Sequence, residues 1–449
     1  MGLPASAGQL SSRPLGCLIF RRLRLHHGGS MSAELERVLK SYADLVVKVA
    51  VNVQPGQRLL VCNPWSWGVS LDALPLVRQI ATTAYEAGAS FVDVLWGDEE
   101  LRRMAFLCAP PETFKRLPAW HSDGVLEYFR RGDAVLILYA EDPDLLKDQD
   151  PAIVAMAEAT LSSQLKPMMD YRSQKVTNCA VVSAPIPRWS ARVFPHETPQ
   201  VQEEKLWSAI FGACYLDCRD PLQSWREHIQ DLGERSKYLT HKKFTALRFT
   251  SEVTDLTVGL ADGHTWHCAG DVTQKGIPFV ANLPTEEVYT LPHRERVEGV
   301  VRSTRPLSCG GVLIEDFTVM FRNGKVVSLA AAKNEEVLKR VLEADEGASR
   351  LGEVGLVPDS SAISQSGVLF FNTLYDENAA SHLAFGRGWK SCIQGGGEMD
   401  DDAFIAHGGN ESVDHVDFMI GSPDMDVDGL TAEGNREPLM RNGEWAFTP

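Results

Sequence analysis

The 449-residue sequence has no uninterrupted apolar run of the ~20 residues that a membrane-spanning helix needs, so we expect no membrane partner. Positive charge is also scarce. The formal net charge is −16, which is unfavourable for binding the phosphate backbone of a nucleic acid, and we expect no such partner. The nine cysteines include no Cys-x-x-Cys pair. Scattered cysteines in odd number are typical of reduced thiols, and we predict a cytoplasmic protein.

A glycine-rich phosphate-binding loop is missing as well. The first expected strand covers residues 58–62, and residues 63–68 after it read NPWSWG, which does not fit G-x-G-x-x-G. No dinucleotide site is therefore expected there. We interpret the N-terminal half as a scaffold.

The length is too great for one ordinary domain, and two are expected. Residues 1–30 contain arginines but no acidic residue, and their apolar run precedes most of the charges, the reverse of a secretory signal. We predict a leader outside the fold at residues 1–31, an N-terminal domain at residues 32–239 and a C-terminal domain at residues 240–449.

Strand and helix patterns alternate in the N-terminal domain. Short apolar runs predict strands at 58–62, 90–96, 134–139 and 179–184, and helical periodicity predicts helices at 72–87, 122–131 and 151–164. Continuously apolar strands separated by helices are typical of a parallel sheet covered on both faces. After about residue 240 short strands and turn dipeptides predominate. The predicted fold class is α/β: an N-terminal parallel-sheet domain followed by a sheet-rich α+β catalytic domain.

The C-terminal domain gathers the carboxylates and imidazoles that suit divalent metal ions. They are Glu286, Glu287, Glu353, Glu377, His382, His415 and Asp417. His415 and Asp417 are two apart, so in a strand both face the same side, whereas the adjacent Glu286 and Glu287 face opposite sides. Asp376, Asn378 or Ser381 is expected to orient the imidazole of His382. The surplus of carboxylates suggests a bridging ligand and hence a dinuclear centre.

Five segments resemble the aminopeptidase T/aminopeptidase S family of metallo-aminopeptidases, and the resemblance extends from about Ser32 to the C-terminus. The segments are 282–288 (NLPTEEV), 294–299 (RERVEG), 351–354 (LGEV), 376–382 (DENAASH) and 415–421 (HVDFMIG). The resemblance implies that Glu353 bridges two divalent ions per chain (Zn, Co, Mn or Mg). It also implies that Glu287, Glu377, His382, His415 and Asp417 are ligands.

The same resemblance implies a homodimer that removes N-terminal residues from peptides with broad specificity. Glu353 would act in catalysis through the metal ions, and Glu286 is the first candidate to carry a proton to the leaving amine. One position departs from the family pattern: Trp389 stands where a tyrosine is often found near the metals.

Two alternatives stay open. A mononuclear non-haem iron ring-cleaving dioxygenase would use His382, His415 and Asp417 as a two-histidine, one-carboxylate triad, but would leave three glutamates without a role. A metal-binding protein without turnover is the other.

Overall fold

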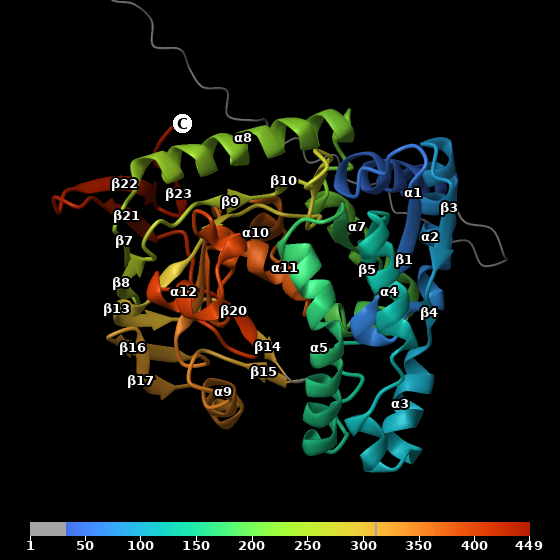
Figure 1. Ribbon diagram of the computed structural model, residues 1–449, viewed down its shortest axis with the longest axis horizontal. Helices are drawn as coiled ribbons and strands as arrows, with labels where there is room; N and C mark the ends of the chain where they lie inside the picture. The colour runs from blue at the N-terminus through green and yellow to red at the C-terminus, as the bar shows by residue number, and fades with distance from the viewer. Residues whose placement is uncertain (1–32, 310–311) are drawn as a thin grey trace, which may run out of the picture.

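The computed structural model describes residues 33–309 and 312–449, so the predicted leader lies outside the described residues. The first half is built around a parallel sheet in the order β3-β1-β5-β6 (Figure 1). Its strands are β1 (Arg58–Cys62), β3 (Phe91–Val94), β5 (Ala134–Tyr139) and β6 (Cys179–Ser183), and a short parallel pair, β2 (Val69–Ser70) and β4 (Trp96–Gly97), stands apart from it. The predicted parallel-sheet class is confirmed, and the strands predicted at 58–62 and 134–139 have those bounds.

Helices connect the strands and pack on the sheet. They are α1 (Ala33–Leu45), extended by a π-helical turn at Val46–Ala50, and α2 (Leu74–Glu86), α3 (Glu99–Cys108), α4 (Trp120–Arg131), α5 (Pro151–Ser173), α6 (Pro187–Val193), α7 (Pro199–Ala213) and α8 (Pro221–Lys242). The prediction for α5 was too short, because the helix continues through Pro167 to Ser173. A proline in a helix removes one hydrogen bond. Leu165 and Met168, on either side of Pro167, are fully buried, and their packing holds the last turns of α5 in place.

The second half consists mainly of two antiparallel sheets. The larger has the order β17-β16-β13-β8-β7-β21-β22-β23, and the smaller has the order β20-β19-β18-β12-β9. The strands are β7 (Ala246–Thr250), β8 (Asp255–Leu260), β9 (His267–Cys268), β10 (Gly270–Val272), β11 (Pro278–Val280), β12 (Val288–Thr290), β13 (Pro292–Arg302), β14 (Leu307–Cys309), β15 (Val312–Ile314), β16 (Thr318–Arg322), β17 (Lys325–Ala330), β18 (Leu351–Leu356), β19 (His382–Gly386), β20 (His415–Met419), β21 (Asp426–Leu430), β22 (Arg436–Arg441) and β23 (Glu444–Trp445). Short helices lie between them: α9 (Glu335–Leu342), α10 (Ala362–Ser366), α11 (Thr373–Asp376) and α12 (Asp401–Ala406).

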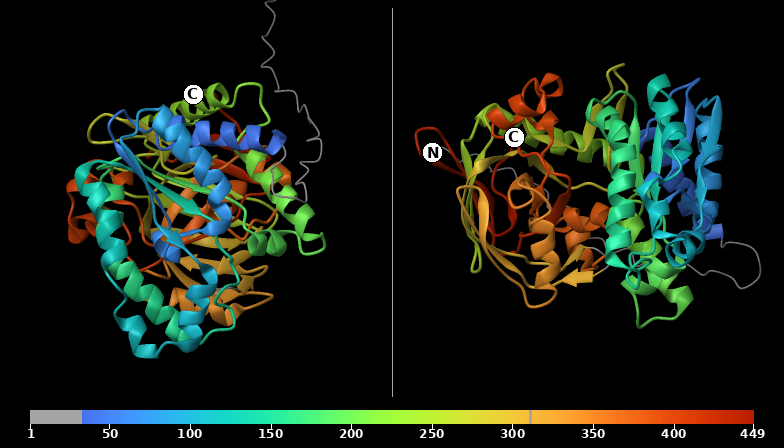
Figure 2. Two further views of the ribbon diagram at one scale, coloured as in Figure 1. Left: turned by 90° about the vertical axis from the view of Figure 1, so that its right-hand side faces the viewer. Right: turned by 60° about the horizontal axis from the view of Figure 1, so that its bottom comes forward.

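The two halves lie side by side and share packing (Figure 2). Helix α8 contacts α1 of the first half as well as β9 and β12 of the second. The hydrophobic core around the parallel sheet also includes Phe370, Leu374 and Tyr375 from the second half. The segment 370–379 is therefore fixed against the first half by buried apolar contact. Within the part of the chain described, no helix combines the length and apolarity needed to span a membrane.

Candidate metal centre

One face of the five-stranded sheet presents four of the predicted metal ligands, Glu353, His382, His415 and Asp417. Glu353 on β18 lies opposite Ala384 on β19, which in turn lies opposite Asp417 on β20. His382 lies opposite Gly355, which is two residues after Glu353 on β18. Because side chains alternate along strands, these residues share a face. The other face, with Val354, Leu383 and Phe418, is fully buried in the hydrophobic core of the second half.

Gly355 makes room for the imidazole of His382. A Cβ atom added to Gly355 would lie 2.3 Å from Cε1 and from Nε2 of His382, far closer than van der Waals contact allows. The ring of His382 therefore lies directly across the backbone of β18. This requirement was not predicted, although its signal is present in the sequence as a glycine two residues after Glu353, on the same face of the strand.

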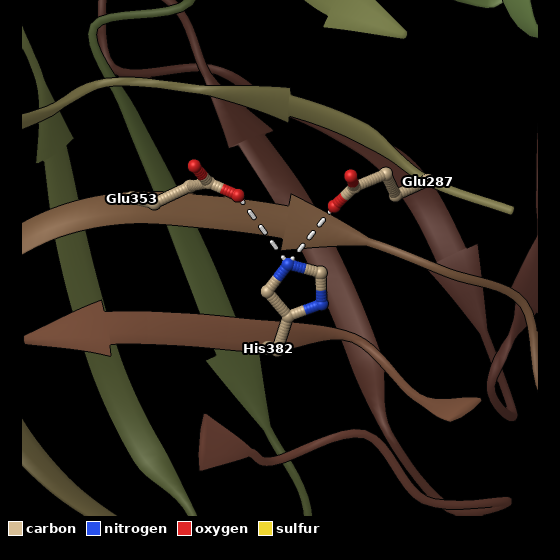
Figure 3. A group of neighbouring side chains, drawn as sticks. All are labelled: Glu287, Glu353 and His382. Carbon is tan, nitrogen blue, oxygen red and sulfur yellow. Dashed lines mark ion pairs between the residues drawn. The ribbon is translucent and has the colours of Figure 1, made fainter. Parts of the chain in front are cut away.

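The first group of candidate ligands consists of Glu287, Glu353 and His382 (Figure 3). Nε2 of His382 lies 3.0 Å from Oε2 of Glu287 and 3.5 Å from Oε1 of Glu353. Figure 3 shows the imidazole pointing between the two carboxylates, which reach it from different strands or strand ends. All three residues are buried.

The second group consists of Glu353, His415 and Asp417, so Glu353 belongs to both groups. Nε2 of His415 lies 3.2 Å from Oδ1 of Asp417 and 3.7 Å from Oε2 of Glu353. Trp389 donates its indole N–H to the same Oε2 of Glu353 at 2.5 Å, and its ring lies 4.9 Å from that of His415 between centroids. The tryptophan thus orients the carboxylate that the two groups share.

The backbone fixes the orientation of both imidazoles. Nδ1 of His382 lies 3.2 Å from the carbonyl oxygen of Ala380, and Nδ1 of His415 lies 2.6 Å from that of Arg387. Donation from Nδ1–H to a carbonyl leaves Nε2 with a lone pair for a metal ion.

The prediction that Asp376, Asn378 or Ser381 orients His382 was wrong. Those side chains bond instead to the backbone of Phe370, Glu286 and Val357, respectively, because these turns need their own polar groups satisfied.

Three buried polar atoms of the described cluster make no hydrogen bond of acceptable geometry, although each lies within ion-pair distance of another candidate ligand: Oε2 of Glu287, Nε2 of His382 and Oδ1 of Asp417. Buried polar groups are normally satisfied, and these atoms converge on the two groups of candidate ligands. Their types, carboxylate oxygen and imidazole nitrogen, suit a divalent cation. The residues present therefore fit the metal ions that the sequence predicted.

Burial and the mutual charges shift the protonation equilibria of the cluster. Burial raises the pKa of Glu287, and it raises that of Glu377 well above its usual range with help from neighbouring carboxylates. Burial opposes the charged form of His415, but the carboxylates of Asp417 and Glu353 outweigh it and raise its pKa to about 9. Protons are thus shared within the cluster, as expected where a cation would displace them.

Two of the predicted residues lie outside the two groups. Glu377 lines the same cavity as the groups and accepts a hydrogen bond from Nδ2 of Asn378 at 3.3 Å. Glu286 does not line it. Its Oε1 accepts from the hydroxyl of Tyr215 at 2.5 Å, its Oε2 lies 3.7 Å from His228, and its backbone N–H donates to Asn378 at 2.7 Å. Glu286 and Glu287 therefore face opposite sides, as expected of adjacent residues in an extended segment.

The cluster opens onto a cavity of about 210 Å³ between the two halves of the chain. The second half contributes the candidate ligands, together with Tyr289 and Trp389. The first half contributes Met169, Arg172 and Lys175, from the end of α5 and the turn after it. This contribution was not predicted, because the first half was expected to be only a scaffold.

A buried cluster of carboxylates and imidazoles at the wall of a cavity defines a metal-dependent enzyme. The sequence profile of the thermophilic metalloprotease (M29) family matches residues 35–445, and the chain belongs to this family. It is thus a metal-dependent peptide hydrolase.

Known relatives align with nearly the whole chain. Aminopeptidase 2 of Geobacillus stearothermophilus is 44% identical over 415 residues, covering 92% of this chain and 98% of its own. Aminopeptidase T of Thermus thermophilus is 43% identical over 410 residues, covering 91% and 98%. The structure of wild-type AmpT from Thermus thermophilus superposes with a TM-score of 0.86 and covers 92% of this chain and all of its own. These comparisons confirm the predicted family and favour the peptidase over the dioxygenase alternative.

Proposed function

We propose that the protein is an aminopeptidase of broad specificity that holds two divalent metal ions per chain. The observation that carries this proposal is that two groups of ligands share Glu353. One ion would be held by Glu287, Glu353 and His382. The other would be held by Glu353, His415 and Asp417, and Glu377 would be a further ligand. The four carboxylates match the charge of two divalent ions, which supports two ions over one. Bound there, Zn, Co, Mn or Mg would activate a water and polarise a carbonyl.

The protein's own residues determine where the peptide can lie. The cavity, at about 210 Å³, is smaller than the ~300–1,000 Å³ of typical small-molecule sites, so it accommodates a short peptide or the N-terminal residues of a longer one. With its ions bound, the cluster would favour the end that carries a free amine, because an amine nitrogen can serve as a ligand of a divalent ion. Apolar and small side chains, including Met169, Phe279 and Ala281, line the remainder and place few demands on the first side chain. Trp389 keeps the shared carboxylate of Glu353 in place through its N–H group.

The proposal is tested by elemental analysis and a matched pair of substrates. We expect two divalent ions per chain, together with hydrolysis of leucine p-nitroanilide but not of its N-acetylated form. The blocked substrate is the control, because its acetyl group removes the free amine and leaves the scissile bond unchanged. One tightly held iron ion, no second ion and no hydrolysis would contradict the proposal.

Two further properties belong to this proposal. A cytoplasmic location is supported by the cysteines, since all eight in the described residues are free thiols. The homodimer rests on the family resemblance.

Glu286→Gln distinguishes two roles for this residue. The contacts of Glu286 with Tyr215, His228 and Asn378 favour a positioning role, in which it fixes the turn that carries Glu287. We then expect both ions to remain, kcat to fall less than tenfold, and the free energy of unfolding to drop by about 1–3 kcal/mol. Tyr215→Phe removes the same hydrogen bond by deleting its donor, so it should have similar effects on kcat and on the free energy of unfolding.

The role as a proton carrier predicts a different result for Glu286→Gln. The value of kcat would fall by roughly 10²–10⁴-fold with the ions retained, and one limb of the pH–rate profile would disappear. Tyr215→Phe would then have a much smaller effect on kcat than Glu286→Gln. Elemental analysis and kcat measured across pH for both variants decide between the two roles.

A further inference from the structure

The first half of the chain supplies a basic wall to the cavity. The last turn of α5 and the residues after it contribute Met169, Arg172, Lys175, Thr177 and Cys179 to the lining. Arg172 and Lys175 are the only lysine or arginine residues that line the cavity within the described ranges. The candidate metal ligands come from the second half, whereas the arginine and lysine of the described lining both come from the first half.

Arg172 is the cation of this wall that no carboxylate neutralises. Lys175 forms an ion pair with Asp271, which also lines the cavity. Among residues 33–309 and 312–449, no carboxylate oxygen lies within ion-pair distance of the guanidinium of Arg172, although its side chain is half-buried. With two divalent ions balancing the four carboxylates of the cluster and Lys175 paired with Asp271, Arg172 is left as the charged side chain of the described lining that has no counterpart.

The immediate neighbours of Arg172 do not supply an anion. Burial raises the pKa of the Cys179 thiol, although the guanidinium beside it acts in the opposite direction. Burial likewise raises the pKa of Tyr139 well above its usual range. Both groups are thus neutral near pH 7. The C-terminal end of α5 also favours a cation, but this interaction is weak for a half-buried guanidinium that has no counterion.

We propose that Arg172 binds a carboxylate of the peptide substrate, and this rests on the proposed aminopeptidase function. Arginine presents a planar fork of N–H donors that matches a carboxylate in two parallel hydrogen bonds. A short peptide carries a free amine at one end and a carboxylate at the other, so the amine can lie at the metal cluster while the carboxylate lies at Arg172. The small volume of the cavity also favours short peptides. Arg172 is thus a determinant of specificity for peptides that carry a carboxylate close to the scissile bond.

The carboxylate has two possible sources, the C-terminus or an acidic side chain, and matched substrates separate them. Leu-Gly and Leu-Gly-Gly are each compared with their C-terminal amides, which differ only in the terminal charge. Leu-Asp-amide is compared with Leu-Asn-amide, which differ only in the side chain. We expect kcat/KM to be about 10- to 100-fold higher for the carboxylate-bearing member of at least one pair, mainly through KM. The peptide length that discriminates best measures the distance to Arg172, at ~3.3–3.6 Å per residue.

Arg172→Gln should reduce that ratio to about one, and Arg172→Lys should retain part of it. Lys166→Gln is the matched control, because it removes one positive charge from an exposed position of the same helix and should leave the ratio unchanged. Metal content and circular dichroism confirm that each variant keeps its ions and fold.

The wild-type ratios test the proposal even if Arg172→Gln does not fold. Equal kcat/KM for both members of every pair would overturn it, and so would an equal loss for both members in Arg172→Gln. These results leave the proposed function standing. If the metal-loaded protein hydrolysed none of these peptides, the proposed function itself would be overturned.

Discussion

Glu353→Gln is expected to lose both metal ions together and to lower kcat by on the order of 10³-fold or more. Glu353 is the one residue that belongs to both ligand groups, with Oε1 toward His382 and Oε2 toward His415. Glutamine offers one acceptor oxygen in place of two, and its amide N–H groups repel cations. It would also place either an amide oxygen or an N–H group against the indole N–H of Trp389, and only the oxygen can accept that hydrogen bond.

Elemental analysis and kcat for leucine p-nitroanilide measure both effects. Glu295→Gln is the matched control, because Glu295 lies at an exposed position of β13, and it should keep both ions and full activity. The dinuclear proposal would be wrong if Glu353→Gln retained two ions and near-wild-type turnover. Loss of one ion with the other fully retained would show that Glu353 does not bridge.

Local sequence signals were sufficient for much of the fold. β1, β5 and β6 are buried along most or all of their length, so their sequences are continuous apolar runs with clear ends. α5 shows the limit of such signals. A proline such as Pro167 normally ends or bends a helix, yet α5 continues to Ser173 because Leu165 and Met168 are packed in the core. These are tertiary contacts, so local sequence does not reveal them.

The candidate site was predictable in its residues but not in its arrangement. His415 and Asp417 share a face because they are two apart in one strand, and this follows from the sequence alone. The antiparallel order that places β18, β19 and β20 side by side follows from long-range pairing between segments about 30 residues apart. The position of Arg172 is even harder to predict from sequence, because it lines the cavity only through the packing of one half of the chain against the other.

Removal of the metal ions is expected to abolish hydrolysis and to lower the melting temperature. Each ion present at 100 times its dissociation constant stabilises the folded state by ~2.7 kcal/mol. Chelation leaves four carboxylates close together in a mostly buried cluster, which is unfavourable unless they bind protons. Activity and melting temperature are measured with chelator and after returning zinc, cobalt or manganese, and the ion that restores both is the best candidate for the native metal. Full activity after exhaustive chelation would contradict a metal-dependent mechanism.

The metal-free protein should also lose stability as pH rises. Burial raises the pKa of Glu287 and Glu377 above the ordinary 4.5, and Asp417 outweighs burial to raise that of His415 from 6.5 to about 9. Each group binds its proton more tightly in the folded state, so the stability it contributes is present at low pH and is lost as pH rises through its folded pKa. For His415 that loss occurs between about pH 6.5 and 9. Burial acts to raise the pKa of Asp417, but His415 lowers it below 3.8, so Asp417 does not titrate in this range.

Glu377→Gln should therefore have opposite effects on the two forms of the protein. Glutamine resembles the protonated acid and cannot ionise, so the metal-free variant should melt at a higher temperature than metal-free wild type near pH 8. The metal-loaded variant should melt lower and bind its ions more weakly, because a ligand carboxylate is gone. Asp262→Asn is a suitable control, because Asp262 lies outside the cavity in an exposed ion pair with Arg296, and its effect should not depend on metal. If Glu377→Gln shifted both melting temperatures in the same direction and by the same amount, Glu377 would be a structural residue rather than a metal ligand.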